Sequence, residues 1–120
     1  MNKIIGLLLI AYSLSCTTFA QKHTPTDTQI KDSIQSLYVL KKYTQASELA
    51  NVYLRKNPYD YEVIYLKGLL AYTSKDWNVA INHFKKSIEN GYNIAEAKYN
   101  IACCYALQSN KSGAKTWLIS

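Results

Sequence analysis

The chain is poor in the residues that mark several common classes of protein. Its 120 residues include only 3 cysteines, 4 glycines, 2 prolines and 2 phenylalanines. The sequence contains no glycine-rich phosphate loop and no serine placed between glycines at nucleophile-elbow spacing, so it lacks these signatures of nucleotide-binding folds and hydrolases. The length allows one small domain, which is too little for a classical nucleotide-binding or barrel enzyme.

The few cysteines do not form a disulfide framework. Cys16 lies near the amino end, and Cys103 and Cys104 are neighbours. Adjacent residues of a helix point about 100° apart, so these two cannot form an intrachain disulfide of normal geometry. No CxxC spacing supports redox chemistry. We expect two buried thiols, with an intermolecular bridge or a reactive thiol as the alternatives.

No apolar run is long enough to span a membrane. Lys3 is followed by an uncharged stretch of about eleven residues at positions 4–14, whereas a membrane-spanning helix needs roughly 20. Thr18-Phe19-Ala20 then places small residues at the two positions that a signal peptidase reads. We therefore predict a signal peptide over 1–20, cleavage after Ala20, and a periplasmic or secreted protein. Two alternatives are lipid attachment at Cys16, since 13–16 resembles a lipobox one place out of register, and an uncleaved anchor.

Acidic residues are also scarce, with 8 against 14 basic ones and a net charge of +6. A solvated basic surface is the simplest interpretation, because the lysines lie near expected hairpin tips and on outer helices instead of along one stripe. Nucleic acid is not an expected partner of an exported protein, although a basic-surface binder of acidic ligands stays an alternative. The lysines concerned are Lys41, Lys42, Lys85, Lys86, Lys111 and Lys115.

The residues that carry out catalysis or bind metals do not cluster in the sequence. His23 and His83 have no Cys, Asp or Glu partner at ligand spacing. Because His83 directly precedes Phe84, we expect it to point away from the core. Asp60 and Glu62 lie at an expected helix start, where a carboxylate suits the helix dipole. We predict no enzyme activity in these residues, no metal and no cofactor.

The rest of the sequence shows helical periodicity. After a polar linker at 21–26, apolar residues recur at three- and four-residue intervals, as at Ile30, Ile34 and Leu37. Turn or cap residues interrupt the pattern at 41–42, 57–58, 74–76, 90–91 and 109–110. These breaks predict six helices, and therefore three helical hairpins.

The helical pattern repeats every 34 residues. Ala46, Ala80 and Ala114 are each 34 positions apart, and Ile34, Gly68 and Ala102 keep the same step. A 34-residue unit of two helices is the tetratricopeptide spacing. In the second unit Gly68, Ala80 and Phe84 stand where that family has its small, alanine and aromatic residues, and Ala102 and Tyr105 match in the third. The sequence therefore resembles the tetratricopeptide repeat (TPR) family over about 27–120.

This resemblance implies an all-α, right-handed superhelix of about three hairpins, with repeats at about 27–60, 61–94 and 95–120. The small residues permit close approach of paired helices, so Gly68 and Ala102 should seat Phe84 and Leu118 of their partner helices. The structural positions are Ala46, Gly68, Ala80, Phe84, Ala102, Tyr105 and Ala114.

The third repeat is about 8 residues short of a full unit. Trp117, Leu118 and Ile119 should then form an apolar patch that needs covering. One interpretation is that the chain is the amino-terminal module of a longer secreted or outer-membrane-associated protein, which could include an enzyme domain. The other is that this end binds a partner.

The resemblance also implies a concave face lined by the first helix of each hairpin. Only Lys31 and Asn100 match the lysines and asparagines with which some family members clamp a terminal carboxylate, so that mode is not expected. Four tyrosines on these helices instead predict an aromatic groove for a peptide or protein partner. The alternative is that they only cover neighbouring helices. The candidate binding residues are Tyr38, Tyr65, Leu69, Tyr72, Tyr99 and Asn100, with Lys31, Gln35, Glu62 and Cys103 beside them.

Overall fold

The structure is a computed structural model that describes residues 23–120. The predicted signal peptide, its cleavage site and Cys16 lie outside these residues. Within them the chain forms six α-helices and no strand, which confirms the predicted all-α fold class. The helices are α2 (Asp27–Val39), α3 (Tyr43–Lys56), α4 (Tyr61–Thr73), α5 (Trp77–Glu89), α6 (Ile94–Leu107) and α7 (Lys111–Ile119).

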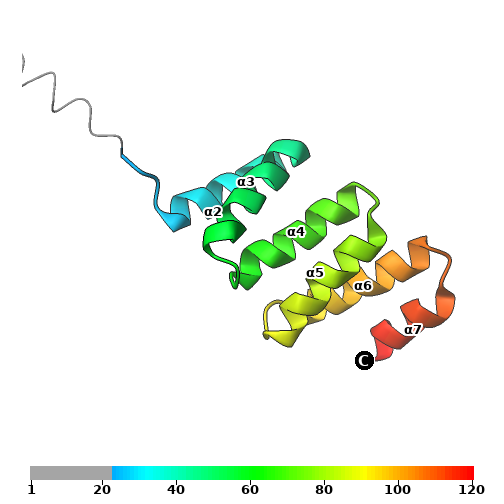
Figure 1. Ribbon diagram of the computed structural model, residues 1–120. Helices are drawn as coiled ribbons and strands as arrows, with labels where there is room; N and C mark the ends of the chain where they lie inside the picture. The colour runs from blue at the N-terminus through cyan, green and yellow to red at the C-terminus, as the bar shows by residue number, and fades with distance from the viewer. Residues whose placement is uncertain (1–22) are drawn as a thin grey trace, which may run out of the picture.

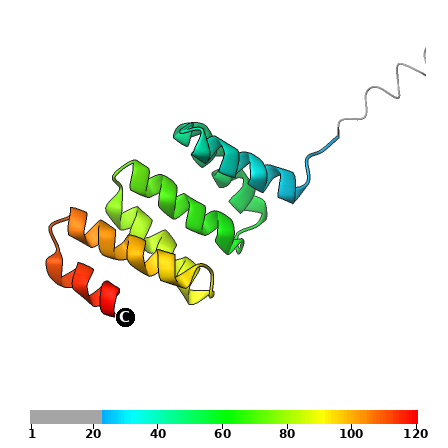
Figure 2. The ribbon, with the colours of Figure 1, turned by 180° about the vertical axis from the view of Figure 1, so that it is seen from behind.

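The helices form three antiparallel hairpins, α2–α3, α4–α5 and α6–α7. Figure 1 shows the hairpins stacked one after another, and Figure 2 shows the same array from behind. Each helix packs against the next one along the chain, and α2 also contacts α4. This is a tetratricopeptide-type array, in which each hairpin covers a face that its neighbour would otherwise expose. None of the helices of 23–120 is long and apolar enough to cross a membrane.

Short polar side chains set the starts of several helices. Thr26 and Gln29 form a capping box at the start of α2, in which each side chain accepts from the other residue's backbone N–H. Asp60 accepts from the backbone N–H of Val63 at 3.3 Å, which confirms its expected capping role at α4. Asn110 caps α7 in the same way. These bonds satisfy backbone donors that a helix start leaves unpaired.

The turn inside each hairpin repeats with the 34-residue period. Lys41, Lys75 and Ser109 each adopt a left-handed backbone conformation, with φ of 60°, 61° and 60°. They follow α2, α4 and α6 and lie within or beside the turns predicted from the sequence. A left-handed residue after a helix lets the chain reverse while the last carbonyls of the helix stay hydrogen-bonded. The tight hairpins therefore depend on this backbone conformation as well as on side-chain packing.

Small residues hold the paired helices close together. A Cβ atom added to Gly68 on α4 would lie 2.6 Å from Cε1 of Phe84 on α5, so only glycine fits beside this ring. Ala46 and Ala80 are fully buried, and Ala114 is 9% exposed. The predicted role of Gly68 as the seat of Phe84 is thus confirmed.

The corresponding prediction, that Ala102 seats Leu118, stays a prediction. Leu118 is 65% exposed, whereas Ala102 is 2% exposed. Trp117 instead packs beside the core of the second and third hairpins, with the ammonium of Lys85 5.6 Å from its ring centre. The equivalent residue Phe84 is covered by both α4 and α6, whereas α7 packs mainly against α6, so Leu118 lacks a second covering helix within the described residues. Ile119 is 74% exposed, so the expected apolar patch at this end consists mainly of Leu118 and Ile119.

The core has two parts that meet on α4. One part joins the first hairpin to α4 through buried residues such as Ile34, Tyr53 and Leu66. The other joins α4, α5 and α6 around Phe84. Leu69 packs against both parts. The fold therefore places α4 at the centre of the array, where it contacts both flanking hairpins.

Candidate partner-binding face

The candidate face is the one expected to be concave. It consists of the outer, solvent-facing sides of α2, α4 and α6, the first helices of the three hairpins (Figure 2). Its predicted side chains differ widely in exposure. Tyr99 is 61% exposed, Tyr38, Leu69 and Tyr72 are partly buried, and Tyr65 is only 8% exposed. The structure therefore leaves an aromatic row of Tyr38, Tyr72 and Tyr99 with surface available to a partner.

Tyr65 is mainly a packing residue between two hairpins. Its ring centre lies 5.4 Å from that of Phe84 and 5.9 Å from that of Tyr92. Its hydroxyl donates to Glu96 Oε2 at 3.2 Å and accepts from Asn100 Nδ2 at 3.1 Å. Burial, together with the nearby Glu96 carboxylate, raises the pKa of Tyr65 to about 12. Asn100, also predicted to contact a partner, is thus engaged with Tyr65.

Tyr38 and Tyr72 occupy equivalent positions 34 residues apart, and each pairs with an aromatic residue of its own hairpin. The Tyr38 and Tyr43 ring centres are 5.7 Å apart, and those of Tyr72 and Trp77 are 5.2 Å apart. Such tilted and edge-on pairs are favourable arrangements of aromatic rings. These two tyrosines therefore pack within their own hairpins and still expose part of their surface on the candidate face.

A polar link repeats between successive first helices. Lys31 on α2 forms ion pairs with Glu62 and with Asp60, the latter at 3.4 Å. Tyr65 contacts Glu96 in the equivalent way, because both residues are displaced by 34 positions. The Lys31 pairs raise the pKa of its ammonium, chiefly through Glu62. Lys31 is thus committed to the interface between hairpins.

Asp60 belongs to the same link. Burial acts to raise the pKa of its carboxyl. The hydroxyl of Tyr53, which donates at 2.7 Å, the backbone N–H of Val63 and the ammonium of Lys31 together outweigh burial and hold that pKa below its usual value. The first and second hairpins are therefore connected by a charged network at the edge of the candidate face.

The two remaining cysteines are free thiols of different exposure. Cys104 is fully buried, and Cys103 is partly exposed on α6. Burial, with a smaller effect of the neighbouring Cys103, raises the pKa of Cys104 to about 11. A thiol with a raised pKa is a poor nucleophile at neutral pH. The prediction of two buried thiols is thus correct for Cys104 alone.

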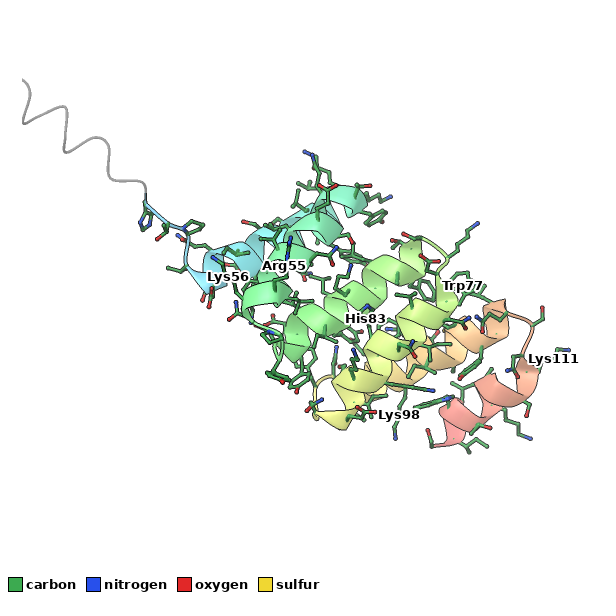
Figure 3. All side chains as sticks on the ribbon, in the orientation of Figure 1. Arg55, Lys56, Trp77, His83, Lys98 and Lys111 are labelled. Carbon is green, nitrogen blue, oxygen red and sulfur yellow. The ribbon has the colours of Figure 1, made fainter. Side chains whose placement is uncertain are left out.

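His83 does not point away from the core, contrary to the sequence-based prediction. It is half-buried on α5 (Figure 3), and its Nδ1 atom is shielded from solvent with no hydrogen-bond partner among residues 23–120. Burial lowers the pKa of His83 to about 4, and the nearby Lys67 and Lys86 add to the effect. The presence of Lys67 among these neighbours shows that α4 flanks the side of α5 that was expected to face solvent.

The lowered pKa predicts acid-sensitive stability. Below pH 6.5 the unfolded chain takes up a proton on His83 that the folded chain resists until about pH 4. The free energy of unfolding should therefore fall through this range as the pH is lowered. Because solvent screens the partly exposed ring, we expect a loss of about 1 kcal/mol between pH 7 and 5. Urea titrations at both pH values should show this loss in the wild type, and His83→Gln should lack that component. An equal pH dependence in both proteins would contradict the assignment.

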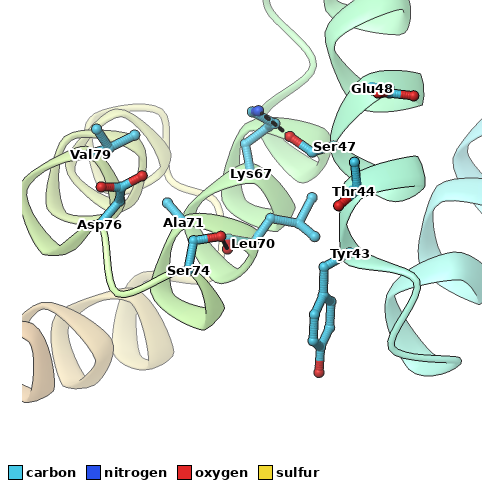
Figure 4. Close-up of a pocket in the computed structure, with 10 residues that line it drawn as sticks. All are labelled: Tyr43, Thr44, Ser47, Glu48, Lys67, Leu70, Ala71, Ser74, Asp76 and Val79. Atoms are coloured by element: carbon cyan, nitrogen blue, oxygen red, sulfur yellow. Dashed lines mark hydrogen bonds between the residues drawn. The ribbon is translucent and has the colours of Figure 1, made fainter.

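The structure also contains a cavity that sequence reasoning did not identify. It lies between α3, α4 and the start of α5, and has a volume of about 310 Å³ (Figure 4).

Within residues 23–120, no group of three His, Cys, Asp or Glu side chains is placed to hold a metal ion. Basic side chains such as Arg55, Lys98 and Lys111 lie on different helices (Figure 3).

Comparison with known proteins gives one local similarity. No protein-family profile matches the chain. Over 75 residues the chain is 28% identical to the DnaJ homolog subfamily C member 7 homolog of Dictyostelium discoideum. The matched stretch covers 62% of this chain but 14% of that protein. With the 34-residue hairpin period, this similarity supports a TPR-like helical repeat.

Proposed function

We propose that this chain is a protein-interaction module that binds a peptide or protein segment across the outer sides of α2, α4 and α6. The row of partly exposed Tyr38, Tyr72 and Tyr99 on these helices carries the proposal. Aromatic side chains bury a large area at a small entropic cost, and they are enriched at protein interfaces. The local similarity to a DnaJ homologue favours the same class of function.

The proposed ligand is an extended or helical segment with apolar side chains. Tyr38, Tyr72 and Tyr99 offer ring surfaces, and Leu69 adds an aliphatic contact between them. Lys31 and Asn100, the two residues that could bind a terminal carboxylate here, are engaged with Asp60, Glu62 and Tyr65. Apolar contact should therefore contribute more to binding than recognition of a chain end.

Photo-crosslinking tests this proposal. A benzoylphenylalanine placed at Tyr99 should capture the partner, since this side chain is 61% exposed on the candidate face. The matched control is the same substitution at Tyr59, which is 78% exposed in the α3–α4 loop. Capture at Tyr99 without capture at Tyr59 supports the proposal. Equal capture at both positions, or capture at Tyr59 alone, would place the partner elsewhere.

We also propose that the protein is exported, on the basis of its amino-terminal sequence. Mass spectrometry of the protein recovered from the extracytoplasmic fraction should find Gln21 as the first residue, with or without cyclisation to pyroglutamate. A lipid-modified first residue Cys16 would show the lipoprotein alternative to be correct. Full-length protein found only in the cytoplasm would contradict export altogether.

A further inference from the structure

The cavity between the first and second hairpins is lined by both polar and apolar side chains. Ser47 on α3 and Lys67 on α4 lie at one end, where Lys67 Nζ donates to Ser47 Oγ at 2.9 Å (Figure 4). Leu70, Ala71 and Val79 supply apolar surface, with Ser74 and Asp76 beside them. The volume of about 310 Å³ is within the range of small-ligand sites.

The equivalent cleft between the second and third hairpins has larger side chains at two positions. Thirty-four positions after Ala71 stands Tyr105, whose ring packs so closely on Gly113 that an added Cβ there would lie 3.0 Å from it. In the same way Gln108 follows Ser74, and it donates to Asn78 Oδ1 at 2.9 Å across the cleft. The cavity therefore borders two positions, Ala71 and Ser74, at which the second hairpin has a smaller side chain than the third.

The pair formed by Ser47 and Lys67 in the cavity also differs from the equivalent pair of the next interface. The positions equivalent to Ser47 and Lys67 are Ile81 and Ile101, which are 4% and 0% exposed and belong to the apolar core. A lysine thus replaces an aliphatic contact at a position that could have been closed. Such a replacement loses apolar packing and partly desolvates a charge, and this cost is offset only where the ammonium gains a partner.

Lys67 has no charged partner within the described part of the chain. Its ammonium is half-buried, no carboxylate lies within 4.0 Å of it among residues 23–120, and the hydroxyl of Ser47 is its recorded acceptor. An ammonium carries three N–H donors, so the bond to Ser47 leaves two for another group. Burial lowers the pKa of Lys67, because it disfavours the charged ammonium. A bound anion would offset this desolvation cost.

We propose that this cavity binds a monocarboxylate that carries a small apolar group, with the carboxylate paired to Lys67 and the apolar group against Leu70, Ala71 and Val79. The rim favours a single negative charge over a phosphate. Glu48 and Asp76 line it, neither forms an ion pair within residues 23–120, and both would repel a dianion more strongly than a monoanion. Their carboxylates could instead accept an N–H next to the ligand's carboxylate, as in an acylated amino acid or a peptide end.

A titration with N-acetyl-leucine tests the site, and N-acetyl-leucinamide is the matched probe without the carboxylate. In ¹⁵N-resolved NMR spectra of the protein, N-acetyl-leucine should shift the amide signals around Ser47, Lys67 and Ala71, with at least about tenfold higher affinity than the amide. Lys67→Met should remove this preference, and Lys111→Met, on an exposed lysine of α7, should leave it unchanged.

A second variant keeps Lys67 and closes the cavity. Ala71→Tyr introduces the residue that fills the equivalent cleft, and it should abolish binding while the circular dichroism spectrum stays helical. Equal affinity for the two probes, undiminished binding by Lys67→Met, or shifts confined to the outer sides of α2, α4 and α6 would overturn the proposal. Tighter binding of inorganic phosphate would also overturn it, as would the absence of shifts at millimolar N-acetyl-leucine.

Discussion

Phe84→Ala is expected to lower the free energy of unfolding by about 3–5 kcal/mol. The Phe84 ring is fully buried, and it packs within the core that joins α4, α5 and α6. Removing it leaves a cavity that the surrounding helices cannot close without losing their own contacts. Urea denaturation followed by circular dichroism measures the loss, and Lys86→Ala, at an exposed position of α5, should change the same quantity by less than about 0.5 kcal/mol.

The contact between Gly68 and Phe84 predicts non-additive effects. Overpacking against the ring should cost about 1–3 kcal/mol in Gly68→Ala, and the roughly 1 kcal/mol that alanine gains over glycine in a helix offsets part of this cost. In Gly68→Ala/Phe84→Ala the clash disappears and the methyl group occupies part of the cavity, so the double loss should be smaller than the sum of the single losses. If Phe84→Ala does not fold, Phe84→Leu completes the same cycle. Additive losses would show that the two residues do not contact each other.

Tyr99→Ala is expected to weaken partner binding about thirtyfold or more, equivalent to about 2 kcal/mol. Tyr99 is the most exposed aromatic side chain of the candidate face, so its loss should leave the melting temperature nearly unchanged. Tyr59→Ala, on a tyrosine of similar exposure outside this face, should not alter the affinity. Isothermal titration of the captured partner segment into the wild type and the two variants measures the three affinities. If Tyr99→Ala binds as well as the wild type, this tyrosine is no anchor of the interface.

Tyr65→Ala should behave differently from Tyr99→Ala. Both residues occupy the same position of the repeat, but α6 covers Tyr65, and no described helix covers Tyr99. Truncation of Tyr65 removes packing against Phe84 and Tyr92 and leaves Glu96 and Asn100 without their shared hydroxyl. Its main effect is therefore a loss of stability, which is why Tyr99 and not Tyr65 is the informative variant for binding.

The features that repeat every 34 residues could be predicted from the sequence. The alanines at 46, 80 and 114, the contact of Gly68 with Phe84, and the turns near Lys41, Lys75 and Ser109 depend on local spacing and on one close partner. A periodic pattern displays such contacts several times, so each occurrence supports the others.

The features that depend on a neighbouring hairpin were predicted less well. The environment of His83 was predicted from Phe84 on its own helix, without the approach of Lys67 on α4. Leu118 was assigned an inward position by its column, but it is 65% exposed, because α7 lacks, within the described part of the chain, the second neighbouring helix that covers Phe84. Helical periodicity gives the direction of a side chain, but its burial depends on the size and position of what faces it.

The cavity was detectable in principle from the same alignment of repeats. Ala71 and Ser74 stand where the third unit has Tyr105 and Gln108, and Lys67 stands where it has Ile101. Two positions with smaller side chains, beside a lysine that has no ion-pair partner among residues 23–120, are a signal of an unfilled space. Which helices border that space, and that Lys67 bonds to Ser47, follow only from the packed arrangement.

The central claim is that a partner binds on the side formed by the first helices of the hairpins. Amide hydrogen–deuterium exchange of the protein with and without the captured segment tests it most directly. We predict slower exchange on binding in α4 and α6, strongest around Tyr72 and Tyr99, with little change in α3 and α5. Protection confined to α3 and α5, or to the loop around Tyr59, would contradict the account.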